Sequence, residues 1–204
     1  MKKLLIPILL IAFALSAHAV VIGGSSFLNE SNTPGETGPF GVVQVLLNTN
    51  TQVARITFHS STTAIIHNHF IDDQVAALNF STTINDFTLI LDPFFKDVVI
   101  NTPTTVSTFG LFNFVMDNHD GTLTPTIIFS VHNTGAAWTS VNQILAFNTH
   151  NVDAAGHMKF GDGSTGFVAE SGRFTTPVPD AGSTVSLFGF GLLGLAAFRR
   201  KLSC

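Results

Sequence analysis

Two histidines one residue apart, His67 and His69, have the spacing in this chain that best fits metal chemistry. On a strand, residues i and i+2 point to the same face, so both imidazoles would lie together, with Asp72 and Asp73 close behind. A catalytic zinc site needs a third protein ligand and an open position, and no HExxH motif supplies them. We therefore expect a solvent-facing strand edge with neutral histidines and no metal. Histidines that could supply a third ligand are His59, His119, His132, His150 and His157.

Two acidic stretches that contain glycine resemble calcium loops in composition, residues 116–121 (MDNHDG) and 161–166 (GDGSTG). An EF-hand loop needs Asp at position 1 when Gly stands at position 6. Position 1 is instead Met116 or Gly161, so neither stretch qualifies. An irregular calcium site on the loops of a β-sandwich stays open as an alternative, and we expect no other cofactor.

Motifs for covalent catalysis are missing from the sequence. Asp162 stands where a G-x-S-x-G motif around Ser164 would need its first Gly. The one cysteine is the last residue, Cys204, which excludes an intrachain disulfide and leaves the rest of the chain without a thiol nucleophile. Acidic residues are plentiful, but no spacing pairs two of them for glycoside hydrolysis. No P-loop or dinucleotide fingerprint occurs, so we expect a protein that is not an enzyme.

Aromatic residues are used for packing more than for recognition. The chain has 20 Phe, one Trp and no Tyr. Phe is purely apolar, whereas Tyr and Trp add the polar group that binding surfaces use. Trp138 could stack on a sugar ring, but we expect it to lie in the core or to plug a loop.

The elements that must position these residues are short runs of β-branched and aromatic residues, separated by Gly, Asn, Asp, Thr and Pro. This spacing is typical of an all-β sandwich, either a jelly roll or an immunoglobulin-like fold. The expected strands are residues 40–47, 52–59, 63–70, 75–80, 87–91, 98–100, 106–115, 126–131, 141–147 and 166–169.

Turn and helix signals add local expectations. The pair Asp120-Gly121 predicts a hairpin between two of these strands. Pro125 predicts an edge strand or a bulge, because proline cannot donate to a ladder. The Asp cap of residues 72–78 (DDQVAAL) predicts one short helix, which competes with a strand over the same stretch.

The charge of the chain is low and unevenly distributed. Charged residues make up 11% of the 204 residues, and the formal net charge is −4. Five of the nine basic residues lie at the two ends, so residues 20–176 hold four basic against twelve acidic residues. A nucleic-acid-binding protein needs a basic face, so we expect no nucleic-acid partner.

The N-terminus has the layout of a secretory signal peptide over residues 1–19. Lys2 and Lys3 precede an apolar stretch at residues 4–15, and Ala17 and Ala19 fit the small-x-small rule for signal peptidase. The apolar run is short for a membrane anchor, which is the alternative interpretation. We expect export by the Sec machinery and a mature chain that begins near Val20.

The C-terminus combines a short motif, an apolar run and a basic cap. The uncharged run at residues 183–198 would span about 24 Å as a helix, and 18 residues counted from Ala181 would span about 27 Å. The basic cap that follows predicts that this end stays cytoplasmic while the bulk of the chain lies outside. A buried core helix is the alternative interpretation. The cap consists of Arg199, Arg200 and Lys201.

This arrangement resembles the PEP-CTERM sorting signal over residues 177–204, and most closely its variant with a Val-Pro-Asp-Ser-Gly core. Ala181 stands where that variant has Ser, and the best-known form has Pro-Glu-Pro. The resemblance implies recognition by an exosortase, a membrane-embedded protease-transpeptidase of Gram-negative bacteria that make extracellular polysaccharide. It implies no activity for the protein itself. The motif residues are Val178, Pro179, Asp180, Ala181 and Gly182.

Taken together, the sequence predicts one secreted domain at residues 20–176 between two address signals. The C-terminal helix would hold it briefly in the inner membrane, before transfer to the cell surface or the exopolysaccharide matrix. We expect a structural or adhesive, non-enzymatic role. The alternatives are a glycan-binding or glycan-cleaving domain, with calcium as a possible aid, and a small metal-dependent hydrolase around His67 and His69.

Overall fold

The computed structural model describes residues 21–61, 68–71, 73–84, 86–91, 97–117 and 121–170. All its regular elements are strands, apart from two single turns of 3-10 helix, η1 (Ser107–Phe109) and η2 (Val141–Gln143). The strands are β1 (Val21–Ser31), β2 (Gly41–Asn48), β3 (Val53–Ser60), β4 (His69–Phe70), β5 (Ala76–Leu78), β6 (Asp86–Leu91), β7 (Asp97–Thr105), β8 (Leu111–Asp117), β9 (Thr126–His132), β10 (Ala154–Lys159) and β11 (Thr165–Glu170). The all-β prediction is confirmed.

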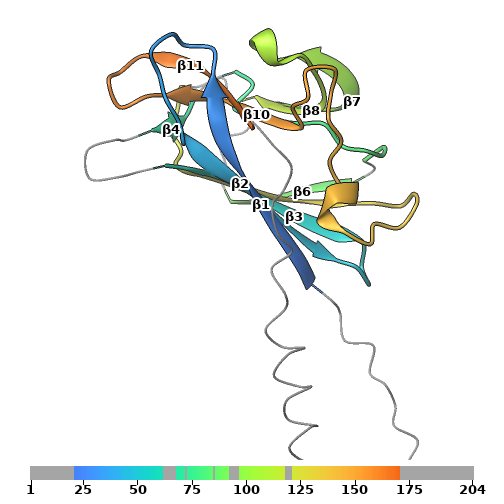
Figure 1. Ribbon diagram of the computed structural model, residues 1–204. Coiled ribbons are helices and arrows are strands. Elements are labelled where there is room, and N and C mark those ends of the chain that lie inside the picture. The colour runs from blue at the N-terminus through green and yellow to red at the C-terminus, as the bar shows by residue number, and fades with distance from the viewer. Residues whose placement is uncertain are drawn as a thin grey trace, which may run out of the picture.

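The strands join into one antiparallel sheet in the order β6-β9-β3-β2-β1-β11-β10-β5-β8-β7, with β4 paired to β10 off this path. The sheet is curled, so that β7 and β8 lie across from β3 and β6 (Figure 1). The two separate sheets expected for a sandwich are not found among the described strands. The reason is β1, which pairs with β2 on one side and with β11 on the other and thereby continues the hydrogen bonding from one half to the other.

A bulge in β1 accompanies this change of partner. The register between β1 and β11 shifts between Leu28 and Glu30. A β-bulge bends its strand and increases the local twist. The bulge therefore lies where a single sheet has to turn to enclose its own core.

Phenylalanines from the two halves of the sheet meet in this core. The ring of Phe114 on β8 stacks on that of Phe129 on β9, with centroids 5.0 Å apart and planes at 16°. Phe87 on β6 packs against both rings, each at 5.5 Å. Burial of such aromatic side chains is the main favourable term that closes the sheet.

Alternation along the central strands leaves one face of β1, β2, β3 and β9 turned away from this core. In β2, every second residue from Gly41 to Leu47 is buried, while Gln44 and Leu46 between them are exposed. β3 alternates in the same way. Alternate residues of a strand point to opposite faces of the sheet, so this pattern indicates a sheet with one buried and one solvent-exposed face. We call this exposed side the outer face.

Two predicted elements are wrong. The short helix at residues 72–78 is absent over its described part: Gln74 has a left-handed backbone (φ 57°) and Ala76–Leu78 form strand β5. The three residues of β5 are buried between β8 and β10, whose backbones they pair with, and this outweighs the helical cap signal. Residues 141–147 form η2 and a loop with one isolated bridge from Leu145 to Phe80, and not a strand.

The connection between β8 and β9 also differs from the prediction. β8 pairs with β5 and β7, while β9 pairs with β3 and β6, so the two strands form no hairpin around Asp120-Gly121. Pro125 precedes an interior strand and not an edge strand. Its carbonyl accepts a hydrogen bond from the Ser60 amide at 2.9 Å. The proline thus lies immediately before β9, where its lack of an N–H group removes no hydrogen bond from the ladder.

Strands β1 and β10 were not predicted. β1 has only Val21 and Ile22 before two glycines and three serines, and β10 begins Ala-Ala-Gly, so neither has a β-branched run long enough to predict a strand. Both chain ends singled out in the sequence, residues 1–19 and 177–204, lie outside the described residues. Within the described part, no helix has the length and apolar character needed to cross a membrane.

Candidate functional site

One row of side chains crosses the outer face, from within β1 to the start of β2 and the end of β3. Phe27 on β1 is opposite Val42 on β2, and Val42 is opposite His59 on β3. The row continues to Thr126 on β9, whose hydroxyl lies 2.8 Å from His59 Nδ1. Phe27 is 53% exposed, which is unusual for so large an apolar side chain.

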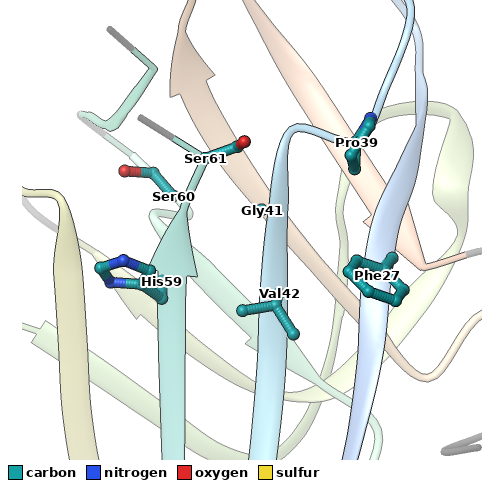
Figure 2. Close-up of a pocket in the computed structure, with 7 residues that line it drawn as sticks. All are labelled: Phe27, Pro39, Gly41, Val42, His59, Ser60 and Ser61. Carbon is teal, nitrogen blue, oxygen red and sulfur yellow. The ribbon is translucent and has the colours of Figure 1, made fainter. Parts of the chain in front are cut away.

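Beside this row lies a hollow of about 260 Å³. Figure 2 shows Phe27, Val42 and His59 side by side on adjacent strands, with Pro39 and the two serines at one end. The volume is slightly below that of typical small-ligand pockets, so at most one ring-sized group would fit in the hollow. Its lining consists of Phe27, Pro39, Gly41, Val42, His59, Ser60 and Ser61.

The backbone around this hollow is tightly fixed. A Cβ at Gly41 would lie 2.6 Å from the His59 carbonyl oxygen, so no other residue fits there without moving β3. The Ser61 amide donates to the Phe40 carbonyl at 2.7 Å. The Ser60 hydroxyl donates to the Pro125 carbonyl at 3.2 Å. The floor is thus formed by backbone held in place before any ligand arrives.

This geometry suits binding better than catalysis. His59 uses Nδ1 toward Thr126, and the buried Ser60 hydroxyl is directed to a carbonyl, so the two do not form a nucleophile–base pair. What remains toward solvent is an aromatic face, one imidazole edge and the exposed end of the hollow. An aromatic face with a few polar groups is the composition of a weak binding site for a ring-shaped ligand.

A second, smaller hollow of about 180 Å³ lies at the other end of the outer face. Asp86 on β6 and His132 on β9 are cross-strand partners there. His132 is also opposite Val53 on β3, the strand that carries His59 six residues later. The two hollows are therefore separated by roughly 20 Å along β3. The lining of the second hollow is Val53, Asp86, Thr88, Ser130, Val131 and His132.

The histidines singled out for metal binding are not brought into a cluster. His67 and Asp72 lie outside the described residues. His69 is half-buried on β4 in register with Lys159, and Asp73 is exposed in a turn. No group of three or more His, Cys, Asp or Glu that could hold a metal occurs in the part of the chain that the structure describes.

The remaining histidines are scattered over the fold. His59 and His132 lie in the two hollows, whereas His157 stacks on Phe167 at 4.5 Å. His150 is exposed in the turn before β10. His119 lies outside the described residues.

Among the described residues of the two stretches that resemble calcium loops, Asp162 and Asp117 each accept hydrogen bonds from the protein itself. Asp162 Oδ1 accepts hydrogen bonds from the Ser164 amide at 2.8 Å and from its hydroxyl at 2.6 Å. These bonds to Ser164, the hydroxyl first, lower the pKa of Asp162. Asp117 Oδ1 accepts from the Gln74 amide at 2.6 Å. Both carboxylates therefore cap turns in this structure.

Trp138 is buried, as expected for a core residue. It is 2% exposed and belongs to the main apolar cluster. Its backbone amide donates to the side-chain oxygen of Gln52 at 2.6 Å. A ring in this position cannot stack on an external sugar.

A buried group of polar residues escaped the sequence analysis. The Ser26 hydroxyl on β1 donates to Glu170 Oε1 on β11 at 2.5 Å, and Glu170 is 1% exposed. Asp153, 4% exposed, lies beside the same carboxyl group and raises its pKa. The only sequence signal was an acid that falls on the apolar side of a strand, two residues after Val168.

Comparison with known proteins identifies one segment. The family model of the VPDSG-CTERM motif matches residues 177–202. No curated protein and no solved structure matches the chain. The match covers the motif, the apolar run and the basic cap that the sequence analysis singled out. The chain therefore carries at its C-terminus a PEP-CTERM-like exosortase sorting signal of the VPDSG type, which indicates an exported protein.

Proposed function

We propose that this protein is exported, processed by an exosortase, and retained as a non-enzymatic structural or adhesive component of the cell surface or of the exopolysaccharide matrix. The single observation that carries the proposal is the sorting signal at residues 177–202. It directly follows a folded all-β domain, whose last described strand ends at Glu170. In this arrangement the domain is the part that is exported, and the C-terminal tail is the signal that directs its sorting.

The two ends of the chain both place the domain on the outer side of the inner membrane in this proposal. A signal peptide at residues 1–19, cut after Ala19, would send the domain across the inner membrane through the Sec machinery. The apolar run at residues 183–198 would then hold it there, with the basic cap on the cytoplasmic side. Pro179 within the motif disfavours helix, which would present the cleavage region in extended form. The anchor is temporary in this scheme, since processing separates it from the domain.

The decisive test is substitution of the motif in the native host. We expect the double variant Pro179→Ala, Asp180→Ala to accumulate in the membrane fraction at unprocessed size. The matched control is Pro34→Ala with Asp162→Ala, which changes the same two residue types at exposed loop positions of the domain. Fractionation and mass spectrometry of the C-terminus give the readout. Normal release of the motif variant would refute exosortase recognition.

A second candidate function, glycan binding, is favoured by the outer face. Phe27 presents an exposed ring beside His59 in the larger hollow. A pyranose has an apolar C–H face that packs on an aromatic ring, while its hydroxyls need donors and acceptors at the edge. His59 and Ser61 supply such groups next to that ring. An extended polysaccharide could then follow β3 toward the hollow formed by Asp86 and His132.

Binding to the host's own exopolysaccharide tests this candidate. We expect Phe27→Ala to weaken binding of the full chain about tenfold, because one stacked ring is worth about 1.4 kcal/mol. The control is Leu111→Ala, which removes a similarly exposed apolar side chain (48%) on β8, away from this face. Equal binding by wild type and Phe27→Ala would show that the polysaccharide does not bind at Phe27 on the outer face. Loss of binding in EDTA would assign a role to calcium, and release of reducing ends would indicate glycan cleavage.

A further inference from the structure

The strongest unexplained feature of the fold is a pair of acids in its interior. Asp153 and Glu170 are 4% and 1% exposed, although acidic residues are almost never fully buried without a charged or hydrogen-bonded partner. Asp153 lies close enough to Glu170 to raise the pKa of that carboxyl, the Ser26 hydroxyl donates to Glu170 Oε1 at 2.5 Å, and Glu170 Oε2 is buried without a hydrogen-bond partner. Two neighbouring carboxyl groups that are buried without a cation strongly disfavour double ionisation, so the pair is expected to hold a proton.

The three residues connect three separate parts of the sheet. Glu170 is the last residue of β11, Ser26 lies within β1, and Asp153 immediately precedes β10. The Asp153 carbonyl is also fixed, since it accepts from the Asn79 amide at 2.9 Å. Backbone pairing reaches this point as well, since Glu170 is opposite Leu28 on β1, while on the other side the pairing of β11 with β10 ends at Ala169, opposite Ala155. The side-chain contacts of Glu170 thus add to the ladder at the C-terminal end of β11.

We propose that the Asp153–Glu170 pair, with Ser26, is a proton-dependent clasp that fixes the end of β11 directly in front of the sorting signal. When the shared proton is present, the clasp is closed. When the proton is lost to a solvent base, two buried carboxylates repel each other and the end of β11 separates from β1 and β10. The clasp is a property of the folded domain and does not depend on the proposed function.

The electrostatics agree with this geometry. Burial, followed by the hydrogen bond and the negative charge of Asp153, raises the pKa of Glu170 from 4.5 to about 9, while the Ser26 hydrogen bond opposes the rise. A folded pKa above the unfolded one means that the folded chain holds a proton which the unfolded chain has released. The stability contributed by the pair is therefore complete below about pH 4.5 and falls as the pH rises toward about 9.

Other titratable groups on the packed strands do not face the pair. His157 and Lys159 on β10 lie on the opposite side of the sheet, where His157 stacks on Phe167. Glu30 on β1 is exposed beyond the bulge. Among the described residues of these elements, Ser26 and Asp153 are the groups that face Glu170. The titration of the pair is thus set by its own three members.

The position of the clasp has a consequence for sorting. Seven residues separate Glu170 from Val178, the first residue of the core motif, so a fully extended chain places the two at most about 29 Å apart. Release of β11 up to Thr165 would add five residues and lengthen this reach by roughly 17 Å. The closed clasp therefore limits how far the sorting motif can lie from the folded domain.

The test titrates the purified full chain in mild detergent. We expect the ¹³C resonance of the Glu170 carboxyl to titrate near pH 9 in the wild type. Asp153→Asn removes the like charge and should lower the midpoint, whereas Ser26→Ala removes the opposing bond and should raise it. Opposite shifts of these two variants would not follow from a loss of packing alone. Titration of Glu170 near 4.5 in the folded wild type would overturn the proposal.

Limited proteolysis gives the structural readout on the same samples. Above the midpoint, cleavage sites mapped by mass spectrometry should appear within residues 165–170 of the wild type. Glu170→Gln keeps the shape of the side chain without its charge and should stay protected at every pH. Glu30→Gln, an exposed acid on β1, is the matched control and should behave as the wild type. Equal pH dependence of cleavage in Glu170→Gln and in the wild type would refute the clasp. If Glu170→Gln does not fold, the titration midpoints of Glu170 in Asp153→Asn and Ser26→Ala still test the proposal. No exosortase is present, so failure here is distinct from failure of sorting.

Discussion

Gln52 and Trp138 hold each other through two hydrogen bonds, although 86 residues separate them. The Trp138 amide donates to Gln52 Oε1 at 2.6 Å, and Gln52 Nε2 donates to the Trp138 carbonyl at 3.2 Å. Gln52 adopts a left-handed backbone (φ 55°) at the start of β3, which directs its amide to the loop that carries the tryptophan. The pair fixes that loop over the core.

Gln52→Ala should destabilise the domain by about 1–3 kcal/mol, because the backbone amide and the backbone carbonyl of Trp138 both lose a hydrogen-bond partner. Trp138 is the one tryptophan of the chain and is buried, so its fluorescence reports unfolding in urea directly. Gln44→Ala, an exposed glutamine on β2, is the control and should change stability by less than about 0.5 kcal/mol. Equal stability of the two variants would contradict the bridging role of Gln52.

Phe114→Ala should have the largest effect of any single truncation considered for this fold. Its ring contacts Phe80, Phe87 and Phe129, with centroids 5.0 to 5.5 Å away, and it joins the two halves of the curled sheet. We expect a loss of about 3–5 kcal/mol in the free energy of unfolding. Leu111→Ala on the same strand is 48% exposed and should cost far less. A small effect at Phe114 would mean that the halves close without this stack.

Gly41→Ala should disturb the pairing of β2 with β3, since the added methyl would lie 2.6 Å from the His59 carbonyl oxygen. We expect a cost of about 1–3 kcal/mol, measured by thermal unfolding, and shifted amide resonances along β3. Ser61→Ala removes a side chain from the same hollow without adding bulk. It should leave both the stability and the β3 resonances near the wild type. Unperturbed β3 resonances in Gly41→Ala would contradict the close approach.

Deletion of residues 199–201 should loosen the topology of the sorting tail. The three basic residues are expected to keep the end of the chain in the cytoplasm. A C-terminal epitope on the deleted chain should become accessible to protease added outside spheroplasts. Arg55→Gln, which removes one exposed cation from the domain, should not change this accessibility. Unchanged protection of the epitope after deletion would show that the basic cap is dispensable.

Local sequence patterns predicted the strands whose apolar residues alternate, because alternation alone fixes which side faces the core. β2 and β3 are examples, and their predicted boundaries differ from the structure by one residue. β1 and β10 could not be predicted in this way, since glycine, serine and alanine pair well only when neighbours on both sides supply the packing. The false helix at residues 72–78 has the same cause, as its last three residues gain two strand partners.

The sequence by itself determined the sorting signal, the all-β class and the burial of Trp138, because each depends on residue order or on side-chain polarity within a short stretch. Only the tertiary structure decided that the strands form one curled sheet, that Phe27 and His59 share a hollow, and that Ser26 meets Glu170 across 144 residues. These features depend on strand order and register. Register is set by the sum of many weak cross-strand contacts, which no single stretch of the chain contains.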